Sequence, residues 1–99
     1  MLRVVQSFRD ETTADLFRER NTRAARRIPR ELWRVVQRKL KLLDAAARLQ
    51  DLLIPAGNRL EPLKGDQAGR HSSRVNDRFR VTFRWENGNA YEVGVEDHH

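Results

Sequence analysis

The chain has 99 residues, no cysteine, 38% hydrophobic residues and a formal net charge of +6 at pH 7. This length suits one small domain and is too short for two hydrophobic cores. The missing thiols exclude disulfides, cysteine nucleophiles and thiolate metal sites. No apolar run approaches the roughly 18 residues that a membrane span needs, and charged residues interrupt the first twenty positions, where a signal peptide would have an apolar core. We therefore expect one soluble, cytoplasmic domain over residues 1–99.

Arginine dominates the basic residues, because lysine supplies only 3 of the 20. A guanidinium group binds phosphate or carboxylate through two parallel hydrogen bonds. Together with a sequence pI near 11.0, this favours a polyanionic partner such as a nucleic acid over a membrane surface. The alternative is a basic surface that is merely solvated.

The N-terminal half predicts one strand and two helices. Leu2–Phe8 is a short first strand, and Asp10–Arg20 is a first helix that begins with acidic residues. An arginine-rich connection, Asn21–Ile28, leads to Pro29 in the first turn of a second helix. Apolar residues at three- and four-residue steps extend that helix from Arg30 to about Leu53. These residues are Leu32, Val36, Leu40, Leu43 and Ala47.

The C-terminal half predicts a run of antiparallel strands. Ile54–Asn58 ends the second helix, Arg59–Lys64 is partly extended and Gly65–Gly69 forms a turn. Three strands follow, at His71–Asn76, Arg78–Glu86 and Ala90–Glu96. The order of elements predicts an α+β fold, in which both helices pack on one face of a mostly antiparallel sheet of about four strands.

Side-chain parity predicts the register of the last hairpin. A two-residue Asn-Gly loop sets Phe83 opposite Glu92, and we reject it for that reason. A three-residue loop, Asn87–Asn89, pairs apolar residues with each other and arginine with glutamate. The pairs are Trp85 with Tyr91, Phe83 with Val93, Val81 with Val95, Arg84 with Glu92, and Arg80 with Glu96.

The strand Arg78–Glu86 has an apolar side and an arginine side. Phe79, Val81, Phe83 and Trp85 share one parity, whereas Arg78, Arg80, Thr82 and Arg84 share the other, and Arg74 continues that side on the preceding strand. Like charges on neighbouring strands repel each other, so such a cluster predicts an anion site. The alternative is a ladder of cross-strand ion pairs, Arg80 with Glu96 and Arg84 with Glu92.

From Asn58 onward the residues form a recognisable pattern. They read NRLEPLKGDQAGRHSSRVNDRFRVTFRW, and the chain ends on VEDHH. The string L-x-P-L-K-G-D, the R-V-N segment, the arginine-bearing strand and an ending close to E-D-Y-H resemble the HigB family of toxins, within the RelE/ParE superfamily. The opening QSF and the segment LDAA at Leu43–Ala46 fit as well.

The resemblance implies a RelE-like toxin of a type II toxin-antitoxin system. It implies cleavage of messenger RNA in the ribosomal A site. We expect no cofactor. The implied partner is a HigA antitoxin that carries a helix-turn-helix, and operator DNA would be reached only through that antitoxin. Two positions depart from the pattern: Glu61 stands where many members have a histidine, and His98 precedes His99 where tyrosine is common.

RNA can be cut without a metal when its own 2′-OH attacks the adjacent phosphorus. The protein then supplies a general base, a general acid and cations that stabilise the phosphorane. The catalytic candidates are Glu61, His71, Arg80, Asp97, His98 and His99, and the candidates for binding RNA phosphates are Lys64, Arg74, Arg78 and Arg84. No metal-ligand spacing such as H-x-x-x-H occurs.

Each of these residues also has an ordinary structural role open to it. His71 can be a half-buried strand residue, and Lys64 can be solvated. Glu61 can pair with a neighbouring base. The terminal histidines can be a cloning remnant, although the preceding Val-Glu-Asp argues against that. Asp97 shares the apolar parity of its strand and needs a partner, so it is expected to orient a histidine or an arginine.

Ten of the twenty bases lie between Arg18 and Lys41. Contact with ribosomal RNA phosphates is expected there, and the alternative is a solvated helical face. The expected ribosomal contacts are Arg23, Arg26, Arg27, Arg30, Arg34 and Arg38. Two rival functions remain: a ParE-like protein that inhibits DNA gyrase without catalysis, and a plain RNA-binding module.

Overall fold

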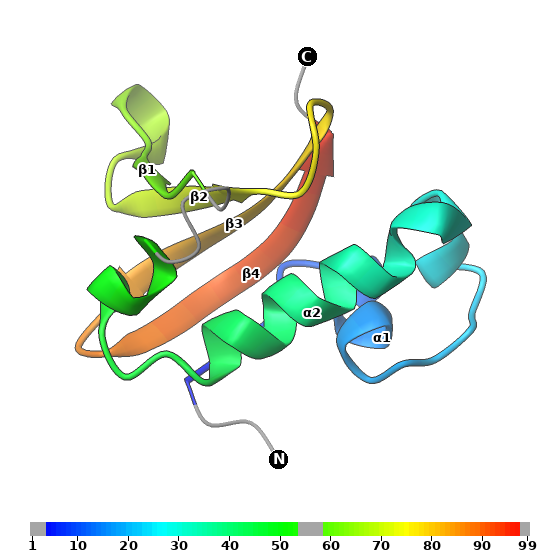
Figure 1. Ribbon diagram of the computed structural model, residues 1–99. Coiled ribbons are helices and arrows are strands. Elements are labelled where there is room, and N and C mark those ends of the chain that lie inside the picture. Colours follow the sequence, from blue (N-terminus) through cyan, green and yellow to red (C-terminus); the bar gives the residue numbers. More distant parts are fainter. Residues whose placement is uncertain (1–3, 54–58, 98–99) are drawn as a thin grey trace.

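The computed structural model describes residues 4–53 and 59–97. Two helices lie on one face of a four-stranded antiparallel sheet in the order β1-β2-β3-β4 (Figure 1), which confirms the predicted α+β fold. The helices are α1 (Glu11–Phe17) and α2 (Trp33–Asp44), and the strands are β1 (Glu61–Pro62), β2 (Arg70–Arg74), β3 (Phe79–Glu86) and β4 (Asn89–Asp97). Within the described ranges, no helix combines the length and apolar character of a membrane span.

The hydrophobic core fills the space between the helices and the sheet. Its fully buried members come from the N-terminal segment, both helices, β3 and β4. They include Val5, Leu16, Val36, Leu40, Val81, Phe83 and Val93. The face of the sheet turned away from α1 and α2 is therefore left for polar side chains.

The N-terminal segment runs parallel to β4 but is not a continuous strand. It forms two isolated bridges, Val5 with Ala90 and Phe8 with Val93. The predicted strand is interrupted because β4 bulges between these two contacts. The backbone N–H of Arg9 still donates to Val93 O at 2.9 Å, which fixes where Arg9 leaves the sheet edge. Residues 2 and 3 of the predicted strand lie outside the described part of the chain.

Helix α1 begins as predicted, with Asp10 at its N-cap. The carboxylate of Asp10 accepts a hydrogen bond from Thr13 N at 2.8 Å. The helix ends at Phe17, three residues before the predicted end at Arg20, and Glu19 follows with a φ of 58°. That left-handed backbone stops the helix.

Helix α2 ends much earlier than predicted. It stops at Asp44, and a separate 3₁₀ helix follows at Leu49–Leu53. The carboxylate of Asp51 accepts hydrogen bonds from the backbone N–H groups of Ala47 and Arg48 at 2.9 and 3.0 Å. Those N–H groups bond to a side chain, so the predicted helix breaks there although its apolar spacing continues. The predicted loop Ile54–Asn58 lies outside the described residues.

The turn between β3 and β4 has two residues, so the predicted three-residue loop is wrong. Asn87 and Gly88 have φ values of 52° and 78°, as a tight Asn-Gly hairpin requires. Next to the turn, Trp85 pairs with Ala90 and Arg84 with Tyr91.

A bulge in β4 restores the predicted register further along the hairpin. Arg84 pairs with Tyr91 and Thr82 with Gly94, so one extra β4 residue is inserted opposite Phe83. Glu92 lies in that stretch with a φ of 51°, and its N–H donates to Ser7 Oγ at 2.9 Å. Beyond the bulge the pairs Val81 with Val95 and Arg80 with Glu96 are as predicted, and the polar side of β3 is preserved.

The buried carboxylate of Asp44 ties the N-terminal segment to α2. Its Oδ1 accepts the backbone N–H groups of Val4 and Val5, both at 3.0 Å, and Asp44 is 6% exposed. These bonds fix the segment that carries Arg9 to the end of α2.

Replacing Asp44 with alanine should lower the free energy of unfolding by about 2 to 4 kcal/mol, because two backbone donors lose their acceptor in a buried place. Asp44→Asn keeps one acceptor oxygen and should lose clearly less. Urea denaturation of both variants measures the difference. Equal stability of Asp44→Ala and the parent protein would contradict this role.

Candidate functional site

The sheet face away from the helices gathers arginines in cross-strand pairs. Arg74 lies opposite Arg80, and Arg70 lies opposite Arg84, in the β2 and β3 register. Paired guanidinium groups on adjacent strands repel each other unless anions neutralise them. Which arginines already have an anionic partner therefore decides where a ligand can bind.

Two arginines near the β2–β3 turn, Arg74 and Arg78, are paired with aspartates. Arg74 forms an ion pair with Asp77 in the turn. Arg78 holds Asp97 at the end of β4 with three N–H to oxygen contacts of 2.8 to 3.0 Å, and these contacts raise the pKa of Arg78. Asp97 was expected to orient either a histidine or an arginine, and the structure gives it an arginine partner.

Two more arginines, beside the bulge, are paired with glutamates. Arg70, whose side chain is 12% exposed, approaches Glu92 at 3.5 Å. Arg84 pairs with Glu86, approaches Glu92 at 3.5 Å, and lies over the Tyr91 ring at 4.7 Å. The Arg84–Glu92 ion pair of the alternative ladder is therefore present, although the bulge moves the two residues out of direct register.

Arg80 differs from these neighbours. No described residue forms an ion pair with it, and its Nη1 atom is buried without a hydrogen-bond partner. Nε of Arg70 and Nδ1 of His71 are also buried without a partner, but Arg70 still has an ion pair with Glu92. Its cross-strand partner Glu96 instead accepts from the Thr82 hydroxyl and pairs with Arg9 at 2.9 Å. The Arg80–Glu96 ion pair of the alternative ladder is not formed. A buried donor without a partner is rare in proteins and calls for an explanation such as a ligand.

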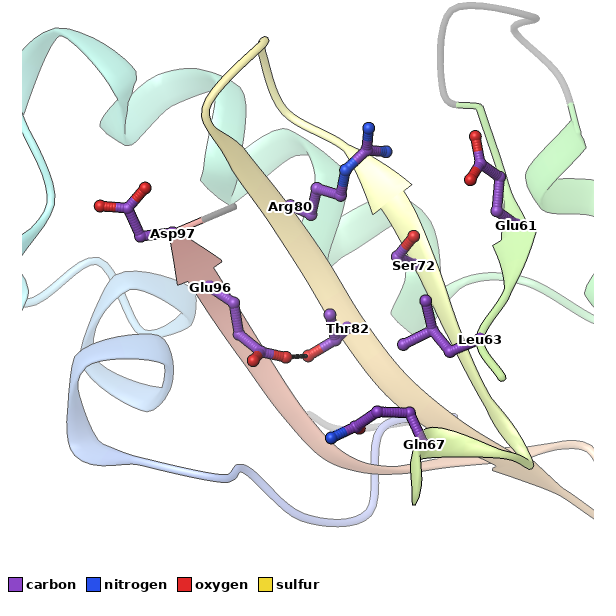
Figure 2. Close-up of a pocket in the computed structure, with 8 residues that line it drawn as sticks. All are labelled: Glu61, Leu63, Gln67, Ser72, Arg80, Thr82, Glu96 and Asp97. Carbon is purple, nitrogen blue, oxygen red and sulfur yellow. Dashed lines mark hydrogen bonds between the residues drawn. The ribbon is translucent and has the colours of Figure 1, made fainter. Parts of the chain in front are cut away.

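Arg80 projects into a pocket of about 260 Å³ on this face, which we call the Arg80 pocket. In Figure 2 the Arg80 side chain rises from β3, Ser72 lies on the neighbouring strand β2, and Glu61 rises from β1 beyond it. Thr82 lies further along β3, where it donates to Glu96. The lining residues are Glu61, Leu63, Gln67, Ser72, Arg80, Thr82, Glu96 and Asp97. The pocket therefore combines a free guanidinium group with carboxylates and hydroxyls, as acid–base chemistry on an anion requires.

His71 lies on the other face of the sheet. Its Cα partner is the core residue Phe83, and the two rings stack with centroids 5.9 Å apart. Its neighbours Arg70 and Ser72 take the arginine side, so strand alternation points His71 away from the pocket. Burial lowers the pKa of His71. The structure does not bring His71 together with Arg80.

The other candidates are more dispersed. Glu61 and Asp97 line the Arg80 pocket, whereas Lys64 is exposed just before the 3₁₀ turn Gly65–Gln67 and is outside the lining. His98 and His99 lie beyond the described residues.

The arginines that were expected to contact ribosomal RNA are all exposed. They are Arg23, Arg26, Arg27, Arg30, Arg34 and Arg38. Among them, Arg30 lies over the Trp33 ring at 4.9 Å. Half-buried Lys39 has a lowered pKa because of burial and the nearby charges of Arg38 and Arg74. These arginines therefore form an exposed basic surface around α2.

Sequence reasoning missed several members of the site. Arg70 was missed because the strand predicted at His71–Asn76 actually starts one residue earlier, at Arg70. Arg9 reaches the site only because the N-terminal segment runs beside β4. The parity of β3 already pointed to Thr82, but no pattern singled out Gln67 or Ser72. Among the described residues, no group of three or more His, Asp or Glu side chains is placed to hold a metal ion.

Comparison with known proteins shows the family of the chain. A model of the family described as RelE-like toxin of type II toxin-antitoxin system HigB matches residues 6–99. The chain is 42% identical over 73 residues to Toxin HigB-1 of Vibrio cholerae serotype O1, covering 74% of this chain and 77% of that protein. It is 38% identical over 65 residues to Endoribonuclease HigB of Proteus vulgaris, covering 62% and 65%.

Solved structures show the same fold at low sequence identity. The YoeB-YefM complex from Staphylococcus aureus matches with a TM-score of 0.60 at 14% identity, covering 96% of this chain and 98% of that one. YafQ of E. coli strain BL21(DE3) matches with a TM-score of 0.57 at 11% identity, covering 96% and 92%. The family model, together with this fold, defines a small RelE-like toxin. The chain belongs to the HigB family of RelE-like toxins of type II toxin-antitoxin systems, which confirms the predicted family.

The half-buried position of His71 predicts a free energy of unfolding that depends on pH. Its pKa is lowered below the usual 6.5, so the unfolded state binds the proton more readily. The His71 contribution is complete above about pH 7 and is lost as the pH falls below about 6.5. We expect His71→Phe to flatten the fall in unfolding free energy between about pH 7 and pH 5. Denaturation curves at several pH values test this, and an identical slope in both proteins would exclude His71 as the cause.

Proposed function

We propose that this toxin is a ribosome-dependent endoribonuclease that cleaves messenger RNA in the ribosomal A site, in the cytoplasm. The observation that carries the proposal is the unpaired guanidinium group of Arg80 in a pocket that also holds carboxylates. The family membership supports it, because one relative is named an endoribonuclease. The family and the chemistry of the Arg80 pocket therefore both support action on a phosphodiester.

The proposed reaction uses the RNA's own nucleophile and needs no cofactor. A general base takes the proton of the 2′-OH, and the 2′-oxygen forms a bond to the adjacent phosphorus. The bond from phosphorus to the 5′-oxygen breaks, and that oxygen takes a proton from a general acid. The products are a 2′,3′-cyclic phosphate and a 5′-hydroxyl. Arg80 stabilises the charge that develops on the phosphorane oxygens.

Glu61 is the described side chain best placed to exchange a proton in this reaction, because it faces the Arg80 pocket and is exposed. His98 and His99 are the other candidates, since histidine exchanges protons near neutral pH. Asp97, anchored by Arg78, holds the chain immediately before them. Lys64, Arg74, Arg78 and Arg84 add positive charge along the path of the RNA backbone, while His71 is omitted because it lies on the other sheet face.

The ribosome holds the RNA strand in place, because this small protein has few means of binding a single strand by itself. Proteins that hold single strands usually stack bases on exposed aromatic rings. The rings here are partly or fully buried, and the arginine-rich surface around α2 is exposed. We propose that this surface binds ribosomal RNA phosphates through charge, without reading bases. The face that carries Arg80 is then free to meet the message.

As a toxin of a type II system, the protein has an antitoxin partner. We propose a HigA-type antitoxin with a helix-turn-helix, through which alone operator DNA is reached. Such a partner brings a whole folded domain, so we favour steric exclusion from the A site over direct occupation of the Arg80 pocket.

Replacing Arg80 tests the proposed function. Arg80→Ala should lower cleavage on programmed ribosomes by on the order of a hundredfold, because a donor to transition-state charge is lost. Stability should change little, since Arg80 makes no ion pair with a described residue. Arg48 does not line the Arg80 pocket. Arg48→Ala therefore removes one positive charge elsewhere, and this control variant should cleave normally. Full cleavage by folded Arg80→Ala refutes the assignment, and gyrase inhibition without cleavage supports the ParE-like alternative.

The proton carrier is identified by two separate variants. If Glu61 is the general base, Glu61→Gln should reduce cleavage on the order of a hundredfold, whereas deletion of His98 and His99 should leave most of it. The reverse ranking would assign the proton chemistry to the terminal histidines. Single-turnover cleavage rates across pH 5 to about 9 distinguish a carboxylate from a histidine by the position of the acid limb.

A further inference from the structure

Glu96 is placed to neutralise Arg80 but is held away from it. The two residues are direct cross-strand partners in β3 and β4. Both carboxylate oxygens of Glu96 are engaged elsewhere: Oε1 pairs with Arg9 Nη1 at 2.9 Å, and Oε2 accepts from the Thr82 hydroxyl. Opposite charges directly across a sheet normally attract. The absence of an Arg80–Glu96 pair therefore has a visible cause.

The Arg9 side chain reaches Glu96 because Gly94 leaves room for it. Its backbone N–H bonds to Val93 O at 2.9 Å, and its side chain then crosses β4 directly over Gly94. A Cβ atom at position 94 would lie 3.1 Å from Arg9 Cδ and 3.2 Å from Arg9 Cβ. Contacts that short would force the arginine stem to move. Gly94 has no positive φ, so here glycine provides space, not backbone freedom.

We infer that Arg9 is a positioning residue that keeps Arg80 available for the substrate phosphate. Arg9 and Thr82 hold the Glu96 carboxylate between them. When Arg9 is lost, one oxygen of Glu96 is released, and its flexible side chain can turn to the guanidinium group opposite. Glu96 then competes with phosphate for Arg80. This inference rests on the proposed role of Arg80 as the phosphate-binding group.

The inference differs from a simple packing role for Arg9. The Arg9–Glu96 pair is partly exposed, with side chains 47% and 35% accessible, so its direct effect on stability is small. If Arg9 only anchored the N-terminal segment, its loss would not be repaired by changing Glu96. If Arg9 restrains a competing carboxylate, neutralising that carboxylate repairs the loss.

The test is a titration of the purified full-length protein with inorganic phosphate, following the Nε–H resonance of Arg80 by NMR. Arg9→Ala should weaken phosphate binding at Arg80 about fivefold, which corresponds to the strength of a surface ion pair. The double variant Arg9→Ala/Glu96→Gln should return to the parent value, and Arg9→Lys should retain most of it. Gly94→Ala, which displaces the Arg9 stem, should reproduce the Arg9→Ala defect.

Arg48→Ala is the control, because it removes one positive charge without touching this contact. Failure of Glu96→Gln to rescue Arg9→Ala would overturn the inference, as would an Arg80 resonance that does not respond to phosphate in the parent protein. Ribosomal cleavage should follow the same order among the variants. If the parent protein fails to cleave RNA, the proposed function fails, while the phosphate titration still decides the role of Arg9.

Discussion

A buried guanidinium nitrogen without a hydrogen-bond partner is the constraint on which the account depends. Leaving such a donor unpaired costs free energy. Nη1 of Arg80 and Nε of Arg70 are both in that state, but of these two arginines only Arg80 also lacks an ion pair with a described carboxylate. Four neighbouring arginines on or beside the same sheet face each have a carboxylate partner. The distribution of carboxylates, more than the number of arginines, therefore decides where this face can bind an anion.

The fold brings that distribution about through contacts between distant parts of the chain. Asp44 holds the N-terminal segment against α2, and this places Arg9 beside β4, within reach of Glu96. The bulge opposite Phe83 keeps Glu92 on the exposed side while the buried side of β3 stays apolar. Arg70 and Arg84 then share Glu92, and Arg80 is left without a carboxylate.

Strand alternation predicted the arginine side of β3 and the Arg80–Glu96 register, because a period of two is visible within a few residues. The same alternation puts His71, three positions from Arg74, on the opposite face, but the choice of His71 as a catalytic candidate rested on the ordinary pKa of histidine and overlooked this. The early end of α2 and the bulge were not predictable, since both depend on contacts of Asp51 and Ser7 that apolar spacing does not reveal. Arg9 was missed for the same reason: it approaches Glu96 from the other end of the chain.

The central claim is that the Arg80 pocket acts on translated RNA. Mapping the 5′ ends of cellular RNA after brief induction of the toxin tests it most directly. The account predicts new 5′-hydroxyl ends inside translated reading frames, in phase with codons, and their disappearance when translation initiation is blocked beforehand. Unchanged 5′ ends in cells that have nevertheless stopped growing, or cuts that persist on untranslated RNA, would contradict it.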